Sequence, residues 1–152
     1  MISNFLNTQK LRHDVEVYRG EGSYGIFRSV KFADGSTLED LISEFTEKIQ
    51  LGQVTETEIE SFVKKKLLPN SIKQECFLST AIERDAVERY AKKVLWHIDV
   101  PKGAKGSMIE SYNVERASEA ELLMQKGSSL LIKNARYNAE NKLWELWANL
   151  YQ

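Results

Sequence analysis

The chain has 152 residues, of which 42% are hydrophobic and 28% charged, which is the composition of one ordinary globular domain. Its 21 basic and 22 acidic side chains give a net charge of −1, so overall charge does not draw it to nucleic acid or membrane surfaces. The single cysteine, Cys76, excludes an internal disulfide and a cysteine-based zinc site, and two histidines argue against a histidine-rich metal centre. No apolar stretch is long enough to span a bilayer, and the amino terminus does not resemble a signal peptide.

The amino-terminal segment predicts strands around a glycine-rich loop. Residues 1–14 are expected to form a short arm or helix. Residues 15–19 alternate apolar and polar side chains and are rich in β-formers, so they predict a strand that stops at Gly20. Residues 26–32 are expected to form another short strand, which ends at a turn over residues 34–36.

Two helices are predicted next, because the spacing of apolar side chains changes to three and four residues. Ser36 or Thr37 can cap the first helix, and Gly52 ends it. The second is expected to cover residues 55–67 and to stop before Pro69.

The second half of the chain is predicted to consist mainly of strands. A short helix over residues 83–91, with Tyr90 facing inward, is expected to interrupt them, and the last two strands are expected to form a hairpin. Trp144 and Trp147 fall on opposite faces of the last strand, where both are expected to pack as core or sheet cover. The expected strands cover residues 75–80, 94–100, 107–109, 128–135 and 143–151.

Two glutamates, Glu119 and Glu121, stand two residues apart, just before an apolar pair and Gly127. In a strand they project from the same face, roughly 7 Å apart along the backbone. Two such carboxylates repel each other by about 2 kcal/mol at an effective dielectric constant near 20. The pair is either a solvated strand edge or a face that meets a positively charged group.

Three short segments, taken in order and with their spacing, resemble a known family. They are Arg19-Gly20 at a strand end, Phe77-Leu78-Ser79-Thr80 at another strand end, and Glu119-Ala120-Glu121. The family is the mono-ADP-ribosyltransferases of the arginine–serine–glutamate class, which includes the enzymatic subunits of clostridial binary toxins and the Rho-modifying exoenzymes. The resemblance extends from Val15 to about Leu150.

The resemblance implies an enzyme that transfers ADP-ribose from NAD, through an oxocarbenium-like transition state as in glycoside cleavage. Glu121 would stabilise the charge that develops on the ribose, and Ser79 would orient that carboxylate. No metal is implied. The residues expected to bind NAD are Arg19, Gly20, Tyr18 and Thr80.

The residue two positions before the catalytic glutamate informs on the acceptor. In this family a glutamate there goes with modification of arginine, and a glutamine goes with asparagine, so Glu119 implies an acceptor arginine on a target protein. Tyr112 or Arg116 is expected to contact that target. The sequence departs from the family pattern at Ala81, where relatives often carry a third serine.

The implied fold is α+β, with two packed, mainly antiparallel sheets flanking an NAD cleft, and helices. Residues 1–152 are expected to form a single, monomeric catalytic domain of a secreted or delivered effector, cut from a longer protein. Two alternatives remain open. One is an NAD glycohydrolase, in which water replaces the acceptor, and the other is an inactive binding module that retains the family fold.

Overall fold

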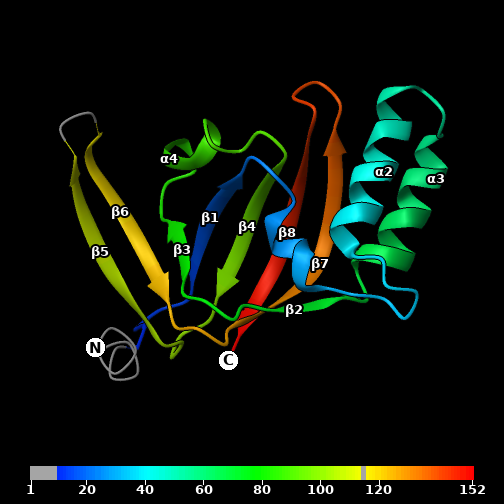
Figure 1. Cartoon of the computed structure of the whole chain (residues 1–152). Coiled ribbons are helices and arrows are strands. Elements are labelled where there is room, and N and C mark those ends of the chain that lie inside the picture. The colour runs from blue at the N-terminus through cyan, green and yellow to red at the C-terminus, as the bar shows by residue number, and fades with distance from the viewer. Residues whose placement is uncertain (1–9, 114–115) are drawn as a thin grey trace.

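The computed structural model describes residues 10–113 and 116–152, but the side chains of residues 108–120 lie outside that description. Helices and strands are mixed along the chain, so the predicted α+β class is confirmed (Figure 1). The elements are β1 (Val15–Glu21), the 3-10 helix η1 (Gly25–Ser29), α2 (Leu38–Gln50), α3 (Glu56–Phe62), the π-helix η2 (Val63–Leu67), β2 (Ser71–Lys73), β3 (Leu78–Ala81), α4 (Asp85–Glu88), β4 (Val94–Val100), β5 (Gly106–Asn113), β6 (Arg116–Met124), β7 (Ser129–Asn138) and β8 (Leu143–Tyr151).

The strands form one eight-stranded sheet in the order β2-β7-β8-β4-β1-β3-β6-β5. Neighbouring strands are antiparallel except β4 and β8, which are parallel. The two sheets implied by the family resemblance are therefore joined into one. The joint is short, because β1 and β3 share a single described register pair, Tyr18 with Ala81. The β3–β6–β5 part of the sheet leans away from the rest beyond that joint (Figure 1).

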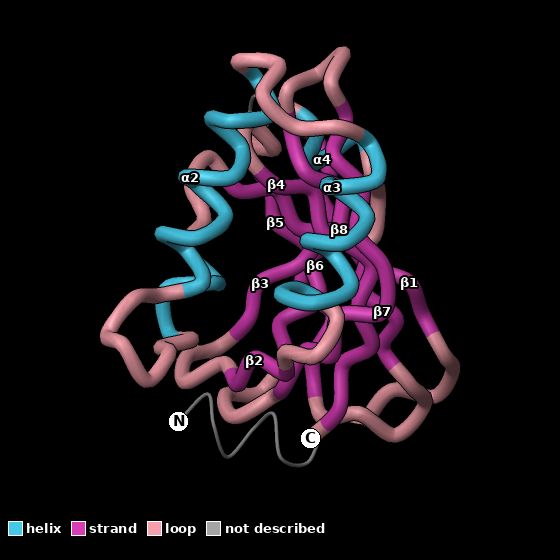
Figure 2. Tube along the Cα trace, turned by 90° about the vertical axis from the view of Figure 1, so that its right-hand side faces the viewer, coloured by secondary structure: helices cyan, strands magenta, loops and turns pink. Residues whose placement is uncertain are grey.

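The helices α2 and α3 run side by side and pack against the β7–β8 end of the sheet (Figures 1 and 2). Phe45 of α2 stacks on Phe62 of α3 with ring centroids 4.0 Å apart, and Phe62 in turn contacts Trp144 of β8. Trp144 is 1% exposed. Trp147 lies on the opposite face of β8 and stacks on His97, so the predicted division of the two tryptophans is confirmed.

Both predicted long helices are present, and both have capping boxes at their amino termini. The Thr37 hydroxyl accepts a hydrogen bond from the backbone N–H of Asp40, and Gly52 follows α2 with a φ of +70°. Thr55 caps α3 in the same way through Glu58. The second predicted helix is not regular throughout, since its last turn is the π-helix η2.

Two predictions about local structure were wrong or incomplete, and one short strand was missed. Residues 26–32 do not form a strand, because η1 turns Ile26 and Phe27 into the core, where Phe27 contacts Trp96. The predicted helix over residues 83–91 is a single α-helical turn, and Tyr90 is 39% exposed instead of facing inward. The short strand β2 was not predicted, because three residues are too few for an alternating pattern to be recognised. In the described part of the chain, no helix is long and apolar enough to cross a membrane.

One buried hydroxyl links α2 to the sheet by hydrogen bonds. Thr46 Oγ1 donates to the carbonyl of Ile42 at 2.6 Å and accepts from Trp144 Nε1 at 2.9 Å and from the Tyr24 hydroxyl at 3.3 Å. A hydroxyl has one donor and two acceptor lone pairs, so all of its hydrogen-bonding capacity is used.

We expect Thr46→Val to lower the free energy of unfolding by about 1–3 kcal/mol, because it leaves the indole N–H and the phenol buried without this acceptor. Denaturant titration measures this loss. Thr46→Ser is the matched control, since it retains the hydroxyl and removes only a methyl group. Equal stability of the valine and serine variants would contradict the role of the hydroxyl.

Candidate active site

The site predicted from the sequence forms at the short joint between the two parts of the sheet. Ala81 of β3 pairs with Tyr18 of β1 on one side and with Glu121 of β6 on the other. Residues that are directly opposite in neighbouring strands point to the same face. Ser79 stands two residues before Ala81 and therefore points to that face as well. The sheet register thus brings together residues that are far apart in the sequence.

Hydrogen bonds connect the three residues that the sequence singled out, one between side chains and one to the backbone. Ser79 Oγ donates to Glu121 Oε2 at 3.4 Å, and Arg19 Nη1 donates to the backbone carbonyl of Ser79 at 2.9 Å. The Thr80 hydroxyl points to the other face and donates to the carbonyl of Leu122 at 2.8 Å. Thr80 therefore adds a side-chain hydrogen bond between β3 and β6.

A cleft of about 200 Å³ opens at this joint. It is smaller than the roughly 300–1,000 Å³ typical of ligand pockets. Cavities of about 410 Å³ and 440 Å³ lie elsewhere, one between β1, β4 and β8 and the other between α3 and β7. We select the small cleft because it alone among these three holds the hydrogen-bonded arginine, serine and glutamate. Its lining residues are Tyr18, Arg19, Gly20, Ser79, Thr80, Ala81, Ala86, Val87, Tyr90 and Glu121.

Arg19 has hydrogen-bonding capacity that the protein does not use. Its Nε is buried and has no hydrogen-bond partner among the described residues. The nearby carboxyl of Glu21 accepts from Trp96 Nε1 at 2.7 Å. Burial raises the pKa of Glu21, and the charge of Arg19 opposes that rise only in part. A guanidinium with an unpaired donor in a cleft fits an anionic ligand such as a diphosphate.

Gly20 is required by the protein itself at this position. A Cβ atom there would lie 2.5 Å from the carbonyl oxygen of Val87 and 2.8 Å from the backbone nitrogen of Ala91. Any side chain would therefore push away the segment of residues 82–92, which carries α4 and forms one wall of the cleft. The family resemblance implies that Gly20 also binds NAD, and this packing requirement is a separate reason for a glycine at this position.

Other residues named from the sequence are described only in part. Glu119 pairs with Ser111 in the β5–β6 ladder, and Arg116 pairs with Asn113 at its far end. Tyr112 belongs to β5. The side chains of Tyr112, Arg116 and Glu119 lie outside the described part of the structure.

The sequence did not identify the wall formed by residues 82–92. Ala86, Val87 and Tyr90 line the cleft together with the predicted residues. These residues could have been identified from their position shortly after Ser79-Thr80, because a segment that follows a strand of the site lies close to the site. The weak helical pattern of residues 83–91 instead led to the prediction that Tyr90 faces inward.

The same fold occurs in solved structures of bacterial toxins. Plx2a, an ADP-ribosyltransferase toxin from Paenibacillus larvae, matches over 99% of this chain and 68% of its own, with 22% identity and a TM-score of 0.68. C3stau2 from S. aureus, solved with NAD, matches over 99% of this chain and 68% of its own, with 16% identity and a TM-score of 0.71. The enzymatic component C2-I of the Clostridium botulinum C2-toxin matches over 99% of this chain but only 32% of its own, with 16% identity and a TM-score of 0.61.

At these identities the likeness shows a common fold. Among curated protein sequences, none matches this chain. The model of the family described as ADP-ribosyltransferase exoenzyme, however, matches residues 1–147. That match covers nearly the whole sequence, and it agrees with the fold and with the resemblance carried by the three short segments. The chain belongs to the ADP-ribosyltransferase exoenzyme family.

Proposed function

We propose that this protein transfers ADP-ribose from NAD to an arginine side chain of a target protein and releases nicotinamide. The observation that carries the proposal is the hydrogen bond from Ser79 to Glu121 beside Arg19 in one cleft. These are the residue types that the reaction needs: a fixed carboxylate for a developing positive charge, and a guanidinium for phosphate.

Arg19 binds the diphosphate of NAD in this proposal. Its Nη1 is already held by the Ser79 carbonyl, so the side chain is ordered before the ligand arrives. The positive charge of the guanidinium then attracts the phosphate oxygens. Tyr18 and Gly20 line the same cleft and contact the rest of the dinucleotide.

Glu121 is the catalytic carboxylate. As the bond between the nicotinamide nitrogen and C1′ of the ribose breaks, its electron pair goes to nicotinamide, and the ribose gains positive charge. The carboxylate stabilises that charge electrostatically, and Ser79 reduces its rotational freedom through the 3.4 Å hydrogen bond. A guanidinium nitrogen of the acceptor then bonds to C1′ and gives up a proton.

Glu119 accepts that proton and orients the guanidinium, which is a poor nucleophile while protonated. Glu119 belongs to β6 and stands two residues before Glu121, which lines the cleft. Tyr112 and Arg116 belong to the adjoining parts of β5 and β6, and we assign them to contacts with the target protein. The similar solved structures are toxins, which supports delivery of this domain as an effector.

Glu121→Gln tests the catalytic carboxylate with almost no change in volume. We expect kcat for NAD cleavage to fall about 10²–10³-fold, because the amide cannot stabilise the positive charge. The release of nicotinamide from labelled NAD measures both hydrolysis and transfer. Far-ultraviolet circular dichroism and the midpoint of denaturation serve as controls for folding. A Glu121→Gln variant that keeps the kcat of the parent would contradict the proposal.

Glu119→Gln tests the acceptor. We expect transfer of ADP-ribose to a small guanidinium acceptor such as agmatine to fall about 10²-fold, because a general base is lost. Hydrolysis of NAD should persist, since water needs no such base from Glu119 here. If parent and variant both hydrolyse NAD and neither modifies the guanidinium, the protein is an NAD glycohydrolase instead.

A further inference from the structure

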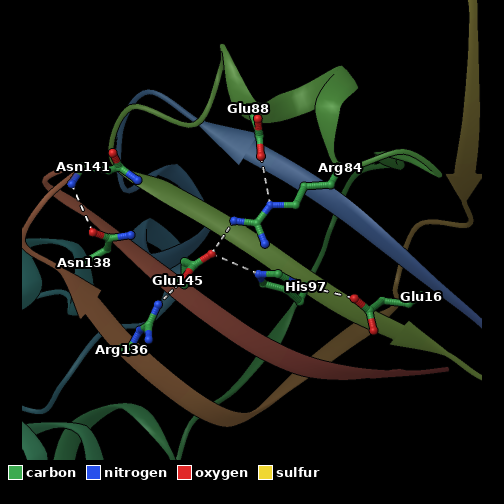
Figure 3. A network of polar contacts seen from close by, with 8 residues as sticks. All are labelled: Glu16, Arg84, Glu88, His97, Arg136, Asn138, Asn141 and Glu145. Atoms are coloured by element: carbon green, nitrogen blue, oxygen red, sulfur yellow. Dashed lines mark hydrogen bonds and ion pairs between the residues drawn. The ribbon is translucent and has the colours of Figure 1, made fainter.

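Glu145 of β8 is a buried carboxylate outside the candidate active site, and it is 4% exposed. Three groups converge on it (Figure 3). Arg84 Nη2 donates to its Oε1 at 2.9 Å, and Arg136 Nη2 donates to its Oε2 at 3.0 Å. His97 Nε2 lies 3.4 Å from Oε1. None of these contacts takes part in the proposed transfer of ADP-ribose, so the cluster has another role in the protein.

The carboxylate is ionised in this cluster. Burial acts to raise the pKa of Glu145, but the hydrogen bonds from His97 and Arg136 and the charge of Arg84 outweigh burial and lower it. An ionised carboxylate with so little exposure needs nearby cations, because removing its partners leaves a buried charge without compensation. Glu145 therefore attracts both Arg84 and Arg136, and their charges compensate its own.

Arg84 belongs to residues 82–92, the segment that forms one wall of the candidate NAD cleft. This segment has little structure of its own, since α4 has only four residues, which is too short to be stable alone. Its carboxy-terminal end is held by backbone hydrogen bonds from Lys92 and Lys93 to the carbonyl of Glu21, and by the close fit on Gly20. Its amino-terminal end follows directly on β3, whose last residue, Ala81, is paired with β1 and β6, and Arg84 adds a side-chain contact with Glu145.

We propose that Glu145 is a positioning residue that acts through Arg84. It fixes residues 82–92 against the sheet, so that Ala86, Val87 and Tyr90 form the wall of the cleft before NAD binds. The part of this inference that concerns NAD rests on the function proposed above. The part that concerns the position of the segment can be tested without any ligand.

The two arginines on Glu145 differ in what they connect. Arg136 lies directly opposite Glu145 in the β7–β8 ladder, where backbone hydrogen bonds already hold both strands in register. Arg84 instead connects β8 to a segment that is not paired with it. The two contacts have nearly the same length, 2.9 Å and 3.0 Å, and reach the same carboxylate. Loss of either one weakens the cluster, but only loss of Arg84 releases the wall.

Arg84→Met and Arg136→Met form a matched pair, because each keeps an unbranched side chain and removes one cation from Glu145. Hydrogen–deuterium exchange of the ligand-free protein is measured first. We expect the amides of residues 82–92 to exchange about tenfold faster in Arg84→Met and at the parent rate in Arg136→Met. Equal exchange in Arg84→Met and the parent, or equal acceleration in both variants, overturns the inference.

NAD turnover is measured next. We expect Arg84→Met to raise KM for NAD about five- to tenfold with kcat within about twofold, and Arg136→Met to leave both near the parent values. A purely structural role for the cluster would instead affect both variants alike. If the parent does not turn over NAD, the proposed function fails, and the exchange experiment alone decides the role of Glu145.

Three further variants separate the contact with Glu145 from the other contacts of Arg84. Arg84 also contacts Glu88 within the segment at 3.0 Å, so Glu88→Gln should leave exchange and KM unchanged if Glu145 is the anchor. Glu145→Gln, made alone and combined with Arg84→Met, completes a double-mutant cycle. If Arg84 acts through Glu145, the double variant has the KM of the single ones. If the effects on KM multiply, Arg84 and Glu145 act independently of each other, which overturns the inference.

Discussion

The short joint between β1 and β3 is the constraint on which the site depends. One described register pair, Tyr18 with Ala81, holds together the two parts of an eight-stranded sheet. A full ladder would close the space between these strands, whereas no joint would leave Arg19 and Glu121 on separate bodies. Because the strands pair and then diverge, the Arg19 guanidinium can reach the Ser79 carbonyl from the neighbouring strand. The space for the cleft is thus created by the pattern of backbone pairing, and the side chains then line it.

The surroundings of the joint are rigid on one side and weakly structured on the other. Trp96 and Glu21 fix the end of β1 through a 2.7 Å hydrogen bond. Opposite them, the segment with α4 continues from Ala81 of β3, contacts Glu145 through Arg84, and packs on Gly20 near Ala91. The position of this segment sets the size of the cleft, about 200 Å³, because Ala86, Val87 and Tyr90 line it.

Much of this could be predicted from the sequence, for identifiable reasons. The strand at Val94–Val100 and the final hairpin have patterns that local chemistry determines, and Thr37 and Gly52 mark the ends of α2. The grouping of Arg19, Ser79 and Glu121 came from the order of short motifs, which periodicity alone could not supply. The failures have a common cause. The 3-10 helix at Gly25–Ser29 and the exposure of Tyr90 are set by tertiary packing, and the Glu145 cluster joins residues with no shared local pattern.

The parallel pairing of β4 with β8 has a consequence for biosynthesis. Although β8 comes last among these elements, it lies between β7 and β4 in the interior of the sheet. Until the ribosome has produced β8, the nascent chain leaves the edges of β4 and β7 unpaired and open to association with other chains. The strands β4, β1, β3, β6 and β5 can pair with one another before that point, but β2 and β7 can join them only once β8 is available.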